Sequence, residues 1–184
     1  MGQMSWLRKS QPEAQPDIQL PIPPAIVRPF DTQSVVEILS WVRGDAELCR
    51  LAPGTPPPLT IEKIQAWHKP GSAVYALHAD AGAAMIGYAE LNPMRDEPRH
   101  FWLGHILIKP DLRGKGWGRA LVTEMVRIAF EERDALRVSL LVFPDNEPAL
   151  RCYRALGFVE RGAEVHLFPA TQKTHRMLRL ELGR

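Results

Sequence analysis

The sequence predicts an α/β domain in which a mixed, mostly antiparallel sheet of six to seven strands is flanked by helices. Two observations predict this class. Seven short segments have the apolar pattern of strands, and a short turn joins two of them into a hairpin. One strand–helix–strand unit over 101–143 adds a crossover, which places a parallel pair within the sheet.

The composition is that of one soluble globular domain. The 184 residues are 45% hydrophobic and 24% charged, which allows an ample core. The formal net charge of +2 is too small to indicate nucleic acid as the main partner. Cys49 and Cys152 are far apart and no CxxC pair occurs, so we expect reduced thiols and no metal site.

The first 24 residues differ from the rest. Five prolines within 1–24 oppose helix formation, so we expect a flexible N-terminal extension followed by a single domain over 25–184. No stretch approaches the roughly 20 apolar residues of a membrane span, and none has the form of a signal peptide. We therefore expect a cytoplasmic protein with no membrane partner.

The first elements of the domain are an edge strand and helices. Ala25–Phe30 is expected to be a strand, and Pro29 suits an edge because proline has no N–H for the ladder. Apolar residues at helical spacing predict a helix over 32–51, which Gly44 can break. A second helix is expected over 60–68, where the first residue is threonine, a preferred N-cap.

Three strands follow in the middle of the chain. Ala73–Ala79 and Ala84–Asn92 flank a short turn and should pair as a hairpin. Phe101–Lys109 is expected to be the third strand. The connection Pro93–Arg99 is polar and long enough to reach over a site.

The last part of the chain alternates helix and strand. Trp117–Arg133 has one apolar face and should be a helix. Arg137–Phe143 is apolar almost throughout, which is typical of a strand buried on both faces. Glu147–Leu156 is a short helix ended by Gly157. The sheet is completed by strands at Phe158–Phe168 and His175–Leu182.

A glycine-rich loop, RGKGWG at 113–118, lies between the strand at 101–109 and the next helix. Its glycines let successive backbone N–H groups converge on an anion, and the helix N-terminus adds its free N–H groups and dipole. Arg113, Lys115 and Arg119 add positive charge. This arrangement favours a pyrophosphate, although a solvated basic turn has the same composition. A P-loop or a dinucleotide fingerprint would need a different spacing.

Two polar residues near the C-terminal end could face one extended ligand. Asn146 stands where a helix begins, and Tyr153 lies two turns further along the same face. An amide and a phenol can therefore meet the same molecule. The alternative for Tyr153 is a half-buried aromatic side chain on a core face.

These two segments resemble one family. LIKPDLRGKGWGRALV followed by NEPALRCYRALGF is similar to the GCN5-related N-acetyltransferase (GNAT) superfamily. The family's acetyl-CoA motif, Arg/Gln-x-x-Gly-x-Gly/Ala, is filled by Arg113, Gly116 and Gly118. The motifs cover 103–158, and the order of elements fits from about residue 25 to the end.

The resemblance implies acetyl-CoA as co-substrate, with no metal. The pantetheine arm would lie along exposed strand backbone before the loop, and the pyrophosphate on the loop itself. The cofactor-binding residues so implied are Ile106, Leu107, Ile108, Arg113, Gly114, Lys115, Gly116, Trp117, Gly118, Arg119 and Asn146. A backbone N–H near Leu107 would stabilise the oxyanion, and Tyr153 would be the general acid that protonates the departing thiolate.

The motifs do not identify the general base, because the positions where relatives carry a carboxylate or histidine hold other residues. His105 is next to one of them but has the opposite strand parity, so it should face away unless a β-bulge intervenes. We take Glu90 as the candidate, with His100 as an alternative. The three positions without a base are Trp102, Gly104 and Leu141.

The expected reaction is direct attack by a primary amine of a small molecule or peptide on acetyl-CoA in a ternary complex. The acceptor site should be built by 32–70, 93–99 and 168–175. Because Leu141 replaces a family carboxylate, an acyl-CoA-binding domain with a sensory role is the alternative. A nucleic-acid binder that uses the basic loop is a third, weaker hypothesis. The resemblance also permits a homodimer formed through the last strands.

Overall fold

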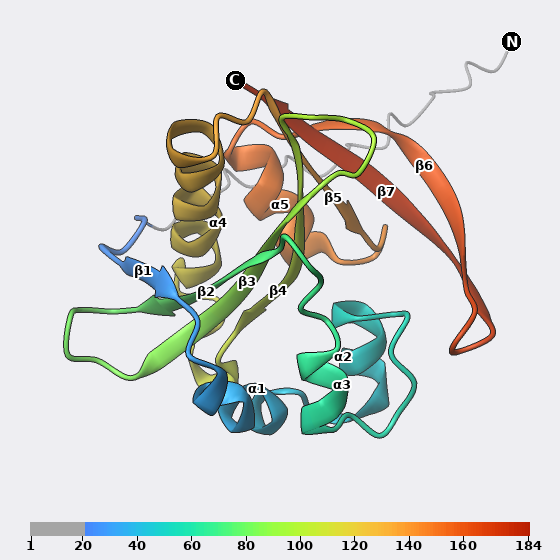
Figure 1. Ribbon diagram of the computed structural model, residues 1–184, viewed down its shortest axis with the longest axis horizontal. Helices are drawn as coiled ribbons and strands as arrows, with labels where there is room; N and C mark the ends of the chain where they lie inside the picture. Colours follow the sequence, from blue (N-terminus) through green and yellow to red (C-terminus); the bar gives the residue numbers. More distant parts are fainter. Residues whose placement is uncertain (1–20) are drawn as a thin grey trace, which may run out of the picture.

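Seven strands form a single sheet in the order β1-β2-β3-β4-β5-β7-β6 (Figure 1). The computed structural model describes residues 21–184, so most of the expected extension at 1–24 lies outside the described residues. All neighbouring strands are antiparallel except β4 and β5, which confirms the mixed sheet. The strands are β1 Ile26–Pro29, β2 Ala73–His78, β3 Met85–Pro93, β4 His100–Ile108, β5 Arg137–Val142, β6 Val159–Phe168 and β7 Lys173–Gly183.

The helices lie close to the predicted positions. The helix expected over 32–51 is divided at Gly44, as the sequence allowed, because Gly44 has a φ of +80° and starts a new helix. The helix expected over 60–68 is shorter, although Thr60 caps it by accepting from the N–H of Lys63 at 3.3 Å. The helices are α1 Val35–Trp41, α2 Gly44–Leu51, α3 Ile61–Gln65, α4 Trp117–Arg127 and α5 Glu147–Ala155, and a π-helical turn at Ile128–Glu132 extends α4.

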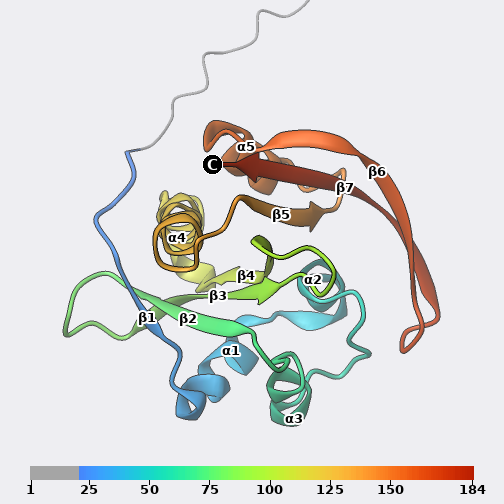
Figure 2. The same ribbon diagram turned by 45° about the horizontal axis from the view of Figure 1, so that its top comes forward.

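The sheet has a hydrophobic core on each face. Helices α4 and α5 pack on one face, where Leu121, Met125 and Leu150 are fully buried. Helices α1, α2 and α3 cover the other face around Ile38, Ile64 and Tyr88. Figure 2 shows α4 and α1 on opposite sides of the sheet, and the β6–β7 hairpin curving away from both. Within the described part of the chain, no helix is long and apolar enough to span a membrane.

Strands β4 and β5 pair only at their beginnings. His100–Trp102 is in register with Arg137–Ser139, and no pairing continues beyond it. On its other side, β4 shifts register against β3 between Tyr88 and Glu90, which is a β-bulge. The diverging strands leave a gap in the middle of the sheet, and the glycine-rich loop follows directly from the end of β4.

Candidate active site

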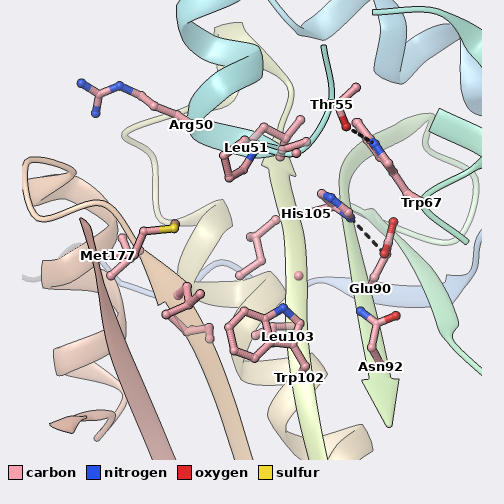
Figure 3. A pocket seen from close by; sticks show the side chains of 18 of the residues that line it. Arg50, Leu51, Thr55, Trp67, Glu90, Asn92, Trp102, Leu103, His105 and Met177 are labelled. Carbon is pink, nitrogen blue, oxygen red and sulfur yellow. Dashed lines mark hydrogen bonds and ion pairs between the residues drawn. The ribbon is translucent and has the colours of Figure 1, made fainter. Parts of the chain in front are cut away.

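A cavity of about 600 Å³ opens where β4 and β5 diverge (Figure 3). Its walls come from β3, β4 and β5, the segment from the end of α2 to the residues after α3, and α5. The apolar and aromatic side chains on its walls include Leu51, Trp67, Trp102, Phe143, Phe168 and Met177. Phe168 of β6 and Met177 of β7 complete the lining, so strands and helical segments surround one cavity that is lined mainly by apolar groups.

The bulge in β4 turns His105 into this cavity. His105 has a φ of +45°, and its imidazole lies on the same face of the sheet as Glu90 of β3. The Nδ1 atom is 3.0 Å from Oε2 of Glu90, an ion-pair distance without the alignment of a linear hydrogen bond. The side chain of His105 is 24% exposed and that of Glu90 is 1% exposed. His105 is therefore the member of the pair that a ligand can reach.

The buried carboxylate of Glu90 is held ionised by its neighbours. Burial alone would raise the pKa of Glu90, but the close contact with His105, the hydrogen bond from the Tyr88 hydroxyl and the electrostatic effect of His68 bring it below its usual value. Tyr88 Oη donates to Glu90 Oε1 at 2.5 Å. The carboxylate thus acts as a fixed anion beside His105 rather than as a strong base.

Trp67 fixes the plane of the His105 ring. The two rings stack at 4.3 Å between centroids, with an interplanar angle of 17°. The indole Nε1 of Trp67 donates to Thr55 Oγ1 at 2.8 Å, which ties the residues after α3 to the loop after α2 (Figure 3). His105 is therefore held on one side by an aromatic ring and on another by a carboxylate.

Helix α5 brings Asn146 and Tyr153 to the lining of the cavity. Asn146 is the N-cap of this helix and accepts from the N–H of Ala149 at 3.4 Å. Tyr153 is 8% exposed, and burial, with a smaller effect of Cys152, raises its pKa well above the usual value. The phenol stays protonated at neutral pH and can donate a proton into the cavity.

The strand register shows which N–H groups of β4 face the gap. Lys109 N–H donates to Ile86 O at 2.9 Å, and antiparallel partners alternate, so Leu107 faces Tyr88 of β3 in the same way. The N–H groups of Ile106 and Ile108 therefore point toward β5. Ile106, which also lines the cavity, thus has its N–H on the side of the gap, whereas the Leu107 N–H faces β3.

The glycine-rich loop forms a turn that leads into the N-terminus of α4. Gly114 and Gly116 have φ values of +72° and +87°, and Gly116 is the N-cap of α4. The first bond of this helix runs from Ala120 N–H to Gly116 O, so the N–H groups of the first turn, including Trp117 and Gly118, are outside the helical ladder. These groups suit a pyrophosphate.

Arg113 anchors the loop rather than extending from it. Its guanidinium donates to Ile108 O at 2.8 Å, contacts the carbonyl of Trp41 and forms an ion pair with Glu47 of α2. Lys115 is exposed at the turn, and Arg119 lies in the first turn of α4. Arg113 thus joins β4 to the α1–α2 layer, and Lys115 and Arg119 supply the loop's charge.

His100, the alternative candidate for the base, lies outside the cavity, and the three positions where relatives carry a base lie inside it. His100 is 4% exposed, with Nε2 2.6 Å from Ser139 Oγ and Nδ1 3.1 Å from Glu97 Oε2, and it does not line the cavity. Trp102, Gly104 and Leu141 all line the cavity without offering a base. Among the residues that the structure describes, no group of three or more metal-binding side chains is close enough to hold a metal ion.

Sequence reasoning missed the surroundings of Glu90. Tyr88 could have been found from its place two residues before Glu90 on one strand, which puts both side chains on the same face. Trp67 and His68 carry no such signal, because their contacts join segments that are about 20 to 40 residues apart in the chain.

Comparison of the sequence with known proteins identifies relatives of this chain. A model of the acetyltransferase (GNAT) family matches residues 36–158. The mycothiol acetyltransferase of Paenarthrobacter aurescens is 27% identical over 117 residues, which are 62% of this chain and 35% of that protein. The N-alpha-acetyltransferase RimI of Mycobacterium tuberculosis is 34% identical over 85 residues, 46% of this chain and 51% of that protein. The chain spans about half or less of the curated relatives it matches.

Solved structures share the fold. The spermidine N-acetyltransferase of Vibrio cholerae, solved with CoA and spermine, has a TM-score of 0.71 at 20% identity and covers 86% of this chain and 95% of its own. The ribosomal-protein-alanine N-acetyltransferase of Brucella melitensis has a TM-score of 0.68 at 20% identity, covering 86% and 99%. Because both structures are 20% identical to this chain, the likeness shows a shared arrangement of strands and helices.

Proposed function

The chain belongs to the acetyltransferase (GNAT) family, and on that premise we propose that it transfers an acetyl group from acetyl-CoA to a primary amine in a ternary complex. The observation that carries the proposal is the cavity that His105, Glu90 and Tyr153 line together. A base for the amine and an acid for the thiolate thus face the same space.

The co-substrate fits the gap and the loop. Acetyl-CoA supplies a thioester and a pyrophosphate. The pyrophosphate would rest on the N–H groups at the start of α4, where the left-handed backbone of Gly116 forms the N-cap. The pantetheine arm would pair with the N–H groups of Ile106 and Ile108, which β3 does not use, and Asn146 would face it from α5.

Three groups act on the reacting atoms. Nδ1 of His105 faces Glu90, so Nε2 is the nitrogen that would take a proton from the ammonium form of the acceptor. The Ile106 N–H would stabilise the oxygen of the attacked carbonyl. Tyr153 would protonate the departing thiolate. It would regain a proton when the acceptor nitrogen loses its second proton on forming the amide.

The charges of the cavity bear on the acceptor. Arg50, Lys63 and Lys69 line it, and of these Arg50 forms an ion pair with Asp145. Glu90, already paired with His105, is the only carboxylate among the described lining residues. Like charges repel a polycation in such a space. We therefore propose an acceptor amine with an apolar body that is neutral or carries an anionic group, rather than a polyamine.

The test is thiol release from acetyl-CoA over a panel of amines. Spermidine, free amino acids with apolar side chains and short peptides with a free N-terminus are compared at equal concentration. We expect kcat/KM for the best amino acid or peptide to exceed that for spermidine by about tenfold or more. Initial-rate lines should intersect, as a ternary complex requires. Parallel lines would indicate an acetyl-enzyme instead, and preference for spermidine would refute the acceptor class.

A further inference from the structure

We propose that Tyr88 and His68 are positioning residues for acetyl transfer, because they form a hydrogen-bonded chain behind Glu90 that keeps its carboxylate turned toward His105. The inference rests on the proposed function, in which His105 takes a proton from the acceptor. Neither Tyr88 nor His68 lines the cavity, so both would act through Glu90.

The chain is continuous from the residues after α3 to the cavity. Tyr88 and Glu90 project from the same face of β3, and Tyr88 Oη lies 2.5 Å from Glu90 Oε1. This is the length of a hydrogen bond to a charged oxygen. Nε2 of the half-buried His68 lies 2.9 Å from the same hydroxyl. Each oxygen of the buried carboxylate thus has one partner, Tyr88 on Oε1 and His105 on Oε2.

The donor and the acceptor in each of these two hydrogen bonds follow from which groups carry a hydrogen. Despite its burial, the pKa of Glu90 is below the usual value, so the carboxylate is ionised and can only accept. Tyr88 has one hydroxyl proton and gives it to Glu90. Burial, and next the charge of Glu90, raise the pKa of Tyr88, so the hydroxyl does not ionise. The Tyr88 oxygen must then accept, and Nε2 of His68 must carry a hydrogen.

Aromatic packing holds the chain in place. Phe30 meets both rings edge-on, at 5.1 Å from Tyr88 and 5.9 Å from His68. Tyr88 itself is fully buried. The ring positions are therefore set by the core beneath α1 and α3, and the two hydrogen bonds follow from them.

The chain matters because, together with His105, it helps to keep a buried acid ionised. Without the Tyr88 hydroxyl, Glu90 Oε1 would stay buried with no charge-assisted donor, which favours the neutral acid. A neutral Glu90 no longer stabilises the positive charge that His105 acquires when it takes a proton. The same substitution removes the acceptor of His68 Nε2, whereas the cavity residues Arg50, Lys63 and Lys69 keep their own hydrogen-bond partners.

Tyr88→Phe tests the proposal, because it removes one hydroxyl and keeps the ring. We expect kcat to fall about tenfold with both KM values within about twofold of wild type. In a carbon-13 NMR titration, the side-chain carboxyl of Glu90 should protonate at a higher pH than in the wild type. His68→Gln, whose amide can donate from nearly the same place as Nε2, should keep more activity than His68→Leu.

Tyr75→Phe is the matched control. Tyr75 is a buried tyrosine on β2, and its hydroxyl accepts from Arg133 at 3.3 Å on the other face of the sheet. Its loss should leave kcat and the Glu90 titration unchanged. Wild-type kcat or a wild-type Glu90 titration in Tyr88→Phe overturns the proposal. The titration needs no turnover, so a failure of the chain is distinguished from an absence of acetyl transfer by the wild-type protein.

Discussion

At the scale of single residues, the backbone of His105 decides the chemistry of the cavity. Strand alternation would turn this side chain away from Glu90, but the bulge adds a residue and a φ of +45° reverses it. A positive φ is uncommon for a residue with a side chain, and such conformations gather at functional sites. The contact with Glu90 at 3.0 Å and the stacking on Trp67 hold the ring in that place.

Tyr153→Phe tests the acid at the same scale. Burial keeps the pKa of Tyr153 high, so the hydroxyl can donate throughout an assay at about pH 6–9. We expect kcat to fall about a hundredfold over that range, with little change in acetyl-CoA affinity. The measurement is kcat against pH beside the Tyr75→Phe control. Turnover that stays at the wild-type level would show that another group protonates the thiolate.

At the scale of elements, the loop at 113–118 joins two layers of the molecule. Arg113 fixes the first end of the loop through its contacts with Ile108 O and Glu47. At the other end of the loop, Gly116 is the N-cap from which the first turn of α4 begins. The described residues Pro21 and Pro23 lie against this turn. A Cβ atom at Gly116 would be 2.9 Å from the carbonyl oxygen of Pro21 and 3.0 Å from Pro23 Cδ.

Gly116→Ala is therefore expected to disturb both stability and ligand binding. The φ of +87° disfavours alanine by about 1–2 kcal/mol of unfolding free energy, and the added methyl group would meet Pro21 and Pro23, so the start of α4 has to shift. Denaturant unfolding and calorimetric titration with acetyl-CoA measure the two effects. Gly82→Ala is the control, because the nearest atom to its Cβ would be 3.8 Å away. Equal behaviour of the two variants would contradict the role of Gly116.

At the scale of the whole molecule, local patterns predicted the fold well. The seven strands, the parallel pair and the cap at Thr60 follow from periodicity, crossover length and residue preference. The division of the helix at Gly44 was open, since a glycine can be tolerated within a helix or end it. The early end of α3 was missed because the residues after it serve tertiary contacts, such as the stacking of Trp67 on His105.

The site could be predicted only in part. The loop and the two residues of α5 have signals in sequence order, and the structure brings Asn146 and Tyr153 to one cavity. The link between His105 and Glu90 depends on a bulge, which periodicity does not show. The contact of His68 with Tyr88 joins the segment after α3 to β3, and no local pattern predicts it.

The most direct test of the central claim is thermal unfolding of the full chain with acetyl-CoA, CoA and ATP at matched concentrations. The gap between β4 and β5 and the start of α4 together should select the pantetheine-bearing ligands. At 100 times its Kd, acetyl-CoA or CoA should add about 2.7 kcal/mol of stability, while ATP adds little. Equal stabilisation by all three ligands would mean that the site recognises phosphate alone. No stabilisation by any of them would contradict an acetyl-CoA site at the gap and the start of α4.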